Sequence, residues 1–312
     1  MDKTESQKIA YSVIVPVYKG AATLEELFHR TKMVFGKLSA SFEMIFIDDG
    51  SPDKSWQVLK KLKDANPDTV KAIKLSKNFG QHNAIFCGLN FVSGDFIITI
   101  DDDLQNPPEE IEKLIQKHRD TEADLVYGFF KRKKHSFWRN IGSRMLKRSA
   151  RKLQDAPGEG SSFKLIERHL IDKILKHHQN FVYIDELFLW YTEDIEFVEV
   201  EHHARKHNKS GYSHGKLLKL FFNVTVYYTA VPLKIMTYLG LISSLISFGF
   251  GIRFIIRKLF FDVPLGYTSI IVTILFAAGL ILLSLGIIGE YLNRIYIVQN
   301  KKPPYSIKKV LK

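Results

Sequence analysis

Short apolar segments alternate with longer amphipathic segments through the first 130 residues of the chain. The apolar segments lack polar alternation, which is typical of strands buried on both faces of a parallel sheet. We expect strands at Tyr11–Tyr18, Glu43–Ile47, Val70–Leu75, Phe96–Ile100 and Asp124–Phe130. The segments between them have helical spacing, at Thr23–Leu38, Lys54–Ala65, Gln81–Val92 and Pro108–Arg119. This alternation predicts a doubly wound, mostly parallel α/β sheet.

Further elements are expected beyond this region. Strands are predicted at Ser162–Ile166 and Ile195–Glu201, and a helix near Asp185–Tyr191. Leu217–Tyr228 has the pattern of an amphipathic helix that lies at a membrane surface.

Two long apolar stretches without charge follow. Ile235–Ile252 has 18 residues and Tyr267–Gly289 has 23, and helices of this length can cross a bilayer. A pair of buried core helices is the alternative, although uncharged runs this long seldom occur in soluble proteins.

These patterns divide the chain into four parts. They are an α/β domain at 1–200, a basic loop with the membrane-interface helix at 201–231, two transmembrane helices at 232–290 and a basic cytoplasmic tail at 291–312. Residues 203–234 and 291–312 each contain six Lys or Arg and no acid. Basic flanks favour the cytoplasmic side of a membrane. We therefore expect the large domain and the tail to be cytoplasmic, on a chain that crosses the cell membrane twice.

Charge narrows the class of partner. The chain has 45 Lys and Arg against 33 Asp and Glu, a net charge of +12, which favours anionic partners. Ten of the basic residues and no acid lie at 131–152, and there we expect Lys131, Arg132 and Arg139 to contact an anionic lipid. A solvated helix face is the alternative. Nucleic acid is disfavoured as a partner, because the block belongs to a chain with a membrane anchor. The single cysteine, Cys87, excludes an intrachain disulfide.

Acidic clusters follow two of the predicted strands. Asp48-Asp49 ends one strand and Asp101-Asp102-Asp103 ends another. The carboxyl ends of parallel strands meet at the edge where open α/β sheets bind ligands. Three adjacent carboxylates need a positive neighbour, which a divalent cation bound to a diphosphate would provide.

An acidic turn that caps the next helix is the alternative for the second cluster. Pro107-Pro108-Glu109-Glu110 is a typical helix start. The chain has neither a Walker loop nor a G-x-G-x-x-G motif after its first strand, so the usual fingerprints of ATPases and dinucleotide-binding enzymes are absent. Among nucleotide sites, the remaining possibility is one built from carboxylates and a metal ion.

Several segments, taken in order, resemble one enzyme family. Ser12–Tyr18 (SVIVPVY), Asp48–Ser51 (DDGS) and Asp101–Glu109 (DDDLQNPPE) resemble the inverting glycosyltransferases of family 2. Leu75–Gln81 (LSKNFGQ), and Gly286–Leu292 (GIIGEYL) followed by Pro303-Pro304-Tyr305, are similar to the subgroup that glycosylates polyprenyl phosphate.

The resemblance implies a GT-A fold and a nucleotide-sugar donor, usually a UDP-sugar. The positions that match its nucleotide-binding residues are Pro16, Tyr18, Asp48, Asp49, Lys77 and Asp101. Asp101, Asp103 and Gln105 match ligands for Mg²⁺ or Mn²⁺. Arg205 and Ser210 match a loop that folds over the diphosphate and the acceptor phosphate, for which a solvated charge run is the alternative. On this basis Asp101, Asp103 and Arg205 are the expected catalytic residues.

One position departs from the subgroup. The subgroup usually has an Asp before its Phe-Arg-Leu strand, where this chain has Ser161-Ser162-Phe163-Lys164-Leu165. The loss is tolerable, because a phosphate monoester with a second pKa of about 6 is already an anion near neutral pH. Asp185, Glu186 and Glu159 are weaker candidates for a base or a sugar-binding group.

The chain is therefore expected to be a membrane-bound, metal-dependent glycosyltransferase. It would transfer a sugar from a nucleotide sugar to polyprenyl phosphate, such as undecaprenyl phosphate, with inversion, at a bacterial inner membrane. The product would be a polyprenyl-phospho-sugar for cell-surface glycans such as lipopolysaccharide. A flippase and a second copy of the chain are further partners to consider. The rival hypotheses are a processive polysaccharide synthase, which usually has more membrane helices and a Gln-x-x-Arg-Trp motif, and a non-catalytic scaffold that binds nucleotide sugar.

Overall fold

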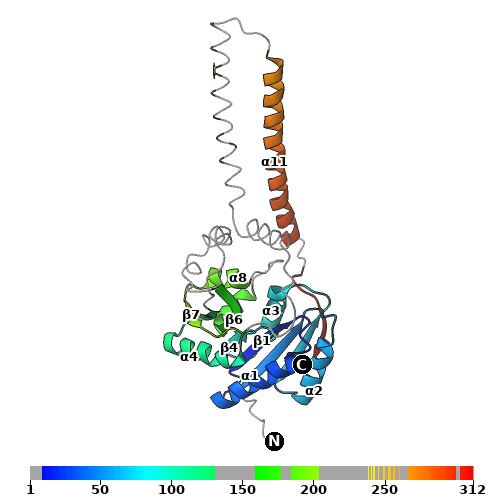
Figure 1. The fold of residues 1–312 in the computed structure, drawn as a ribbon, viewed down its shortest axis with the longest axis vertical. Coiled ribbons are helices and arrows are strands. Elements are labelled where there is room, and N and C mark those ends of the chain that lie inside the picture. The colour runs from blue at the N-terminus through cyan, green and yellow to red at the C-terminus, as the bar shows by residue number, and fades with distance from the viewer. Residues whose placement is uncertain are drawn as a thin grey trace. The chain divides into compact units, whose positions relative to one another are not determined.

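A computed structural model of the chain describes residues 9–130, 159–176, 184–203, 266–299 and 303–311, with isolated helical positions between 238 and 260. The chain divides into two units. The first contains Met1–Trp138, Ala150–Ser210 and Lys301–Lys312, and the second contains Arg139–Ser149 and Gly211–Asn300. Figure 1 shows the first unit as a sheet with helices packed on it. The four-part division expected from the sequence stays a prediction.

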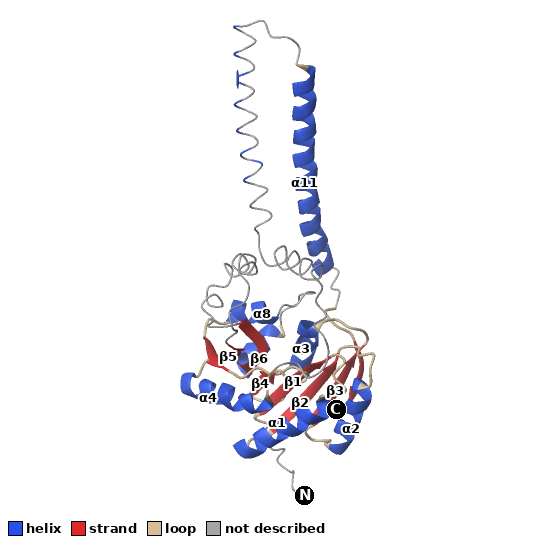
Figure 2. Ribbon diagram, in the orientation of Figure 1, coloured by secondary structure: helices blue, strands red, loops and turns tan. Residues whose placement is uncertain are grey.

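An eight-stranded sheet forms the centre of the first unit, in the order β7-β5-β6-β4-β1-β2-β3-β8 (Figure 2). Its middle strands are β1 (Tyr11–Val17), β2 (Phe42–Asp48), β3 (Val70–Leu75) and β4 (Phe96–Thr99). β1 pairs in parallel with both β2 and β4, and β2 pairs in parallel with β3. The carboxyl ends of these four strands therefore lie at one edge, as the alternating pattern predicts.

The flanks add two antiparallel strands to a sheet whose other strands run in the same direction. β6 (Glu159–Glu167) runs antiparallel between β4 and β5 (Leu125–Phe130), and β5 pairs in parallel with β7 (Ile195–Glu199). β8 (Ile307–Leu311) runs antiparallel along β3. The prediction of a doubly wound α/β sheet is confirmed in its parallel middle. The strand predicted at Ser162–Ile166 is β6, but its direction could not be predicted, because an apolar pattern reports burial and not strand direction.

Helices cover both faces of the sheet, with one apolar core on each face. The first core is covered by α1 (Leu24–Leu38), α2 (Ser55–Ala65) and α4 (Ile111–Thr121), and the second by α3 (Gln81–Leu89), α7 (Arg168–Ile174) and α8 (Ile184–Tyr191). In β1, Val13 and Val15 belong to the first core and Ile14 to the second, because successive strand residues point to opposite faces. Every residue of β1 is buried, which explains its unbroken apolar sequence.

Some predicted boundaries differ from the observed ones. α3 ends at Leu89 rather than at Val92, and β7 ends at Glu199 rather than at Glu201. The predicted helix Pro108–Arg119 begins as a 3-10 turn, η1 (Pro108–Glu110), before α4 starts. These differences arise at element ends, where local hydrogen bonding rather than apolar spacing decides the boundary.

The end of the chain differs most from expectation. The sequence pattern predicts a tail at 291–312, whereas the last residues of that stretch form β8. Val310 and Leu311 pack against the two cores, while Lys308 and Lys309 are exposed. Lysines on an edge strand discourage pairing with further chains, and they also made this strand look like a solvated tail.

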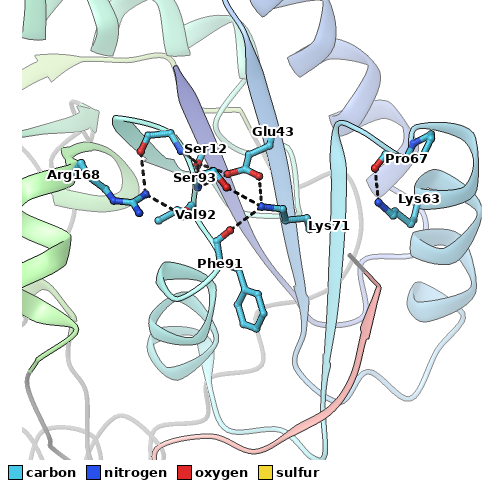
Figure 3. Close-up of polar contacts among 10 residues, drawn as sticks. Ser12, Glu43, Lys63, Pro67, Lys71, Phe91, Val92, Ser93 and Arg168 are labelled. Atoms are coloured by element: carbon cyan, nitrogen blue, oxygen red, sulfur yellow. Dashed lines mark hydrogen bonds and ion pairs between the residues drawn. The ribbon is translucent and has the colours of Figure 1, made fainter. Parts of the chain in front are cut away.

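A polar network joins the parallel strands at the edge opposite their carboxyl ends (Figure 3). The carboxylate of Glu43, only 1% exposed, accepts hydrogen bonds from the Ser12 hydroxyl at 2.7 Å and the Ser93 amide at 2.6 Å. Lys71 forms an ion pair with the same carboxylate at 2.6 Å. The Ser12 oxygen in turn accepts a hydrogen bond from the Gly94 amide at 2.8 Å. This network fixes the start of β4 against β1 and β2, because a buried carboxylate must keep its partners.

The second unit contains α11 (Tyr267–Gln299), which has 33 residues. Within it, Phe276–Asn293 is long and apolar enough to cross a membrane, and it is the one such helix among the residues that the structure describes. Large side chains such as Leu282 and Leu285 are exposed, which argues against a buried core helix. Of the other predicted membrane segment, Ile235–Ile252, only isolated helical positions are described, so a second crossing is not confirmed. The predicted interface helix Leu217–Tyr228 lies outside the described residues.

Candidate active site at the carboxyl ends of the parallel strands

The acidic clusters predicted from the sequence follow β2 and β4 at the same edge of the sheet. β1 lies between these strands, with Val17 opposite Asp48 and Ile14 opposite Thr99. Asp49 follows β2, and the three carboxylates that begin with Asp101 come shortly after β4. The loop after β1 therefore begins between two groups of acids.

Side chains from neighbouring loops hold the backbone of the loop after β1. Four consecutive amides each donate a hydrogen bond to a side-chain oxygen. The pairs are Tyr18 to Asp102 Oδ2 at 3.0 Å, Lys19 to Ser51 Oγ at 3.1 Å, Gly20 to Ser55 Oγ at 3.1 Å and Ala21 to Asp53 Oδ2 at 3.4 Å. Lys19 has a positive φ of 61°, an uncommon conformation for a non-glycine residue, and its own amide is one of the four anchored groups. The ring of Tyr18 is left 46% exposed.

Gly20 brings this loop into direct contact with Asp102. A Cβ atom on Gly20 would lie 2.3 Å from Asp102 Oδ2, which is far shorter than any van der Waals contact. The hydroxyl of Thr23 also donates a hydrogen bond to the Asp102 carbonyl. The loop after β1 and the acidic turn after β4 are thus packed as one unit.

Asp49 binds the loop that leads from β3 into α3. Its carboxylate accepts a hydrogen bond from the Phe79 amide at 2.7 Å and from the Gly80 amide at 2.8 Å. Burial raises the pKa of Asp49, an effect that these two amide hydrogen bonds oppose. Asp49 thereby fixes the position of this loop. The loop backbone also passes close to Gly50, where a Cβ atom would lie 2.6 Å from the backbone carbonyl carbon of Lys77.

Asp48 is turned into the protein. Its side chain is completely buried, accepts a hydrogen bond from the Ser51 amide at 2.9 Å and forms an ion pair with Lys74 at 3.3 Å. This arrangement holds the turn that carries Asp49.

The three carboxylates after β4 have different partners. Asp101 accepts hydrogen bonds from the Gln81 side chain at 2.6 Å and from the Ser162 hydroxyl. Asp102 faces the loop after β1, and burial together with the charges of its two neighbours raises its pKa to about 7. The Oδ1 atom of Asp103 accepts a hydrogen bond from the Gln105 amide at 3.1 Å. Asp101 and Asp103 are only partly buried, and their oxygen atoms are the ligand type that Mg²⁺ and Mn²⁺ prefer.

A histidine that sequence analysis did not assign lies beside Gln105. His202 Nε2 is 3.5 Å from the Gln105 side-chain nitrogen, and the His203 amide donates a hydrogen bond to the Gln105 carbonyl at 2.8 Å. The His202 ring stacks on Phe130, with centroids 4.0 Å apart. In the sequence, the pair of adjacent histidines was the only sign of a possible site here. Their spacing does not indicate that they would lie beside Gln105.

Asp185 was a candidate base, but its carboxylate already has buried partners. It forms an ion pair with Lys164, which is 1% exposed, and accepts a hydrogen bond from the Tyr127 hydroxyl at 2.9 Å. Burial by itself would raise the pKa of Asp185, but the charge of Lys164 outweighs it and the pKa is lowered. Asp185 therefore serves to neutralise Lys164 beneath the site.

Of the remaining predicted site residues, two lie in the described part of the chain and five lie outside it. Pro16 lies in β1 opposite Ile47, and Lys77 is exposed with its amine 5.2 Å from the centre of the Phe79 ring. Lys131, Arg132, Arg139, Arg205 and Ser210 lie outside the described residues. The structure thus brings together the nucleotide-binding and metal-binding candidates, and the acceptor-binding candidates stay predictions.

Another group of possible metal ligands lies at the opposite edge of the sheet. Ligand atoms of Asp124, Glu167 and His169 are within 4.8 Å of one another. Asp124 precedes β5 and Glu167 ends the antiparallel β6, which puts both away from the carboxyl ends of the parallel strands. His169 is 3.1 Å from Asp124 and 3.0 Å from Glu167, so these contacts account for the cluster without a cation.

Comparison with known proteins identifies the family. The model of glycosyl transferase family 2 matches residues 12–175. Two relatives are undecaprenyl-phosphate 4-deoxy-4-formamido-L-arabinose transferases from two strains of Klebsiella pneumoniae. Each is 32% identical over an alignment of 308 residues, and the match covers 96% of this chain and 93% of the relative. The chain belongs to glycosyl transferase family 2. These relatives also confirm the predicted resemblance to its polyprenyl-phosphate subgroup.

More distant likenesses come from solved structures. S. aureus TarS 1-349 in complex with UDP-GlcNAc is 19% identical, with 70% of this chain and 65% of that chain covered and a TM-score of 0.48. Glucosyl-3-phosphoglycerate synthase from Mycobacterium tuberculosis, in complex with Mn²⁺, UDP-glucose and phosphoglyceric acid, is 18% identical, with 70% and 78% covered and a TM-score of 0.49. These values are too low to support any statement about substrate or metal in this chain.

The contact between Gly20 and Asp102 predicts that adding one methyl group at position 20 will destabilise the fold. We expect Gly20→Ala to lower the free energy of unfolding by about 1–3 kcal/mol, because the new Cβ must displace the Asp102 turn. Gly36→Ala is the matched control, since a Cβ there meets nothing within 4 Å and alanine favours a helix by roughly 0.5–1 kcal/mol. Urea unfolding of the detergent-solubilised chain measures both. Equal effects of the two substitutions would contradict the observed contact.

The ion pair of Asp185 with Lys164 predicts a pH-dependent stability. Asp185→Asn should destabilise the protein at pH 7 by about 3–5 kcal/mol, because it leaves a buried charge uncompensated. The folded pKa of Asp185 is lowered, so its stabilisation is complete above the unfolded pKa of about 3.9 and is lost as the pH falls further. The variant and the wild type should therefore converge below that pH.

The matched control for this measurement is Asp172→Asn. Asp172 is 60% exposed and lies 3.5 Å from Arg168, so its loss should cost about 0–1 kcal/mol. Urea unfolding between pH 3 and pH 7 compares the three proteins. If Asp185→Asn were no more destabilising than Asp172→Asn at pH 7, the assignment of Asp185 to a structural ion pair would be wrong.

Proposed function

We propose that the chain is a membrane-bound, metal-dependent glycosyltransferase that transfers a sugar from a UDP-sugar to polyprenyl phosphate with inversion. The proposal is supported by membership of glycosyl transferase family 2 and by relatives named for undecaprenyl phosphate that match 96% of the chain. The observation that carries it is the convergence of Asp49, Asp101 and Asp103 at the carboxyl ends of β2 and β4, beside the exposed ring of Tyr18.

The nucleotide is proposed to bind between the loops after β1 and β2. Tyr18 offers an exposed aromatic face on a rigid loop, which suits stacking against a base. Asp48, Asp49 and Pro16 shape the floor of this site, and the exposed amine of Lys77 lies on the adjacent loop, where it suits a diphosphate. The carboxylate of Asp49 would accept hydrogen bonds from the nucleoside, and lysine would offset phosphate charge. Asp48 would act by holding the turn that carries Asp49.

The acidic turn fits a divalent cation by the chemistry of its donor atoms. Asp101 and Asp103 supply hard oxygen ligands on either side of Asp102, and Gln105 adds an amide oxygen two residues on. Asp102, whose pKa is raised to about 7, is turned toward Tyr18 and Gly20. When bound, Mg²⁺ or Mn²⁺ would stabilise the negative charge of the leaving diphosphate.

The acceptor phosphate is proposed to act as its own nucleophile. One of its oxygens attacks the anomeric carbon while the bond from that carbon to the nucleoside diphosphate breaks, and the bonding electron pair leaves with the diphosphate. A single displacement of this kind inverts the configuration. The phosphate is largely dianionic at pH 7, with a second pKa of about 6, so it needs no protein base. This agrees with the engagement of Asp185 by Lys164 and with Ser162 in place of an acid.

The acceptor and its membrane are the remaining parts of the proposal. A polyprenyl chain requires a bilayer, and Phe276–Asn293 is a candidate crossing. Lys131, Arg132, Arg139, Arg205 and Ser210 are proposed to bind the acceptor phosphate and the lipid surface, with Arg205 acting on the reacting phosphates. The catalytic domain would face the cytoplasm of a bacterial inner membrane, on a chain that crosses the membrane more than once.

A lipid-product assay tests this function. Purified full-length protein is incubated with undecaprenyl phosphate, Mg²⁺ or Mn²⁺ and one nucleotide sugar at a time, and the lipid fraction is analysed by mass spectrometry. We expect one UDP-sugar to give a lipid-linked phospho-sugar, and EDTA to abolish the product. Asp103→Asn should lower the rate about 100-fold or more, because it removes a proposed metal ligand worth several kcal/mol to the transition state.

Asp120→Asn is the control for the loss of one carboxylate. Asp120 is exposed on α4 and its partner in the described structure is Gln116, at 2.8 Å, so its rate should equal that of the wild type. A full rate with Asp103→Asn would refute the metal assignment. Binding of a UDP-sugar without any lipid product would favour the non-catalytic scaffold instead, and a growing glycan chain would favour a processive synthase.

A further inference from the structure

The C-terminal segment contacts the end of β3 and the start of the loop that binds Asp49. Ser76 donates its amide hydrogen bond to the Ser306 carbonyl at 2.8 Å, directly after the last pairing of β3 with β8 at Leu75 and Ile307. Ser76 is also the first residue of the segment Ser76–Gly80, here called the donor loop, whose Phe79 and Gly80 amides bind Asp49. The last residues of the chain thus hold the beginning of this loop.

The same C-terminal segment also holds the element that follows the donor loop. The Tyr305 ring packs edge-on against Phe86 of α3, with centroids 6.3 Å apart. Its hydroxyl accepts a hydrogen bond from the Asn90 side chain at 3.1 Å and lies near the buried thiol of Cys87. Burial raises the pKa of Tyr305 to about 12, so the hydroxyl stays protonated. α3 begins at Gln81, whose side chain binds Asp101.

Two adjacent residues therefore contact the start of the donor loop and the helix that follows it. Ser306 fixes its start and Tyr305 fixes the helix into which it runs. Between these points the loop provides the amides for Asp49, and the first residue after it provides the amide group for Asp101. Gly80 has a φ of 93°, a conformation that glycine adopts readily and that leaves the loop little rigidity of its own.

We propose that Tyr305 and Ser306 form a positioning element for nucleotide binding, with Tyr305 as its principal residue. It acts through the donor loop and α3 and does not itself touch the substrate. The inference rests on the proposed function, because it assumes that Asp49 and Asp101 belong to a nucleotide site. It assigns a role in donor binding to the residues that follow the candidate membrane helix, whose last residue, Gln299, is only six positions before Tyr305.

Substitutions at Tyr305 in the full-length protein test this role. Tyr305→Ala removes both the ring and the hydroxyl, and Tyr305→Phe removes the hydroxyl alone. Val310→Ala is the matched control, because Val310 packs against the same core as Tyr305 but lies further along the chain, in β8, where it pairs with Ile73, away from the donor loop. Three quantities are measured: hydrogen exchange of the Phe79 and Gly80 amides without ligand, affinity for UDP with Mn²⁺, and the KM values for donor and lipid.

We expect Tyr305→Ala to speed exchange at Phe79 and Gly80 and to weaken UDP binding, each by about tenfold, as the loss of roughly one hydrogen bond would do. The donor KM should rise with the affinity loss while the lipid KM stays constant. Tyr305→Phe should have an intermediate effect. Val310→Ala should lower the melting temperature without changing loop exchange or UDP affinity.

The outcomes separate this inference from the proposed function. Unchanged exchange at Phe79 and Gly80 in Tyr305→Ala, or equal acceleration in Val310→Ala, would overturn the positioning role whether or not UDP binds. Accelerated exchange with an unchanged UDP affinity would also overturn it. If the wild type bound no nucleotide while Tyr305→Ala still loosened the loop selectively, the proposed function would fail and the mechanical link alone would stand.

Discussion

Hydrogen bonds from backbone amides to buried carboxylates organise the candidate active site. Asp49 accepts hydrogen bonds from two amides of the donor loop, and Asp102 accepts one from an amide of the loop after β1. Each such bond joins two loops that are far apart in sequence, so the carboxylates act as rigid links before any ligand binds. Hydrogen bonds to charged groups are stronger than neutral ones, and water cannot easily compete for them once they are buried. The site would therefore be largely preformed.

The sheet supplies the geometry that these links require. β1, β2 and β4 are neighbours that run in parallel, which puts the ends that carry Tyr18, Asp49 and Asp101 at one edge. At the other edge, the network around Glu43 fixes the strands relative to one another. Beneath the site, the neutralised pair of Lys164 and Asp185 anchors α8 to β6. Buried polar groups are costly when unpaired, so all three clusters restrict the arrangement of the loops.

Sequence patterns predicted the parallel middle of the fold well, because unbroken apolar runs such as β1 have few alternatives to a buried strand. They also indicated which acids follow which strands. They could not show that Asp48 turns inward to Lys74, that Asp185 neutralises Lys164 or that Gln81 binds Asp101. Those contacts join residues of different elements, and the pair of Lys164 with Asp185 also depends on the direction of β6, which no local pattern encodes. β8 was missed because its exposed lysines resemble those of a solvated tail.

The position of the bound metal is the most direct test of the account. Crystals of the full-length protein grown with Mn²⁺ and UDP allow the ion to be located by anomalous diffraction at the manganese absorption edge. We predict a peak coordinated by Asp101 and Asp103, beside the UDP diphosphate and at the carboxyl ends of the parallel strands. A peak at Asp124, Glu167 and His169, with none at the acidic turn, would contradict the assignment of the active site.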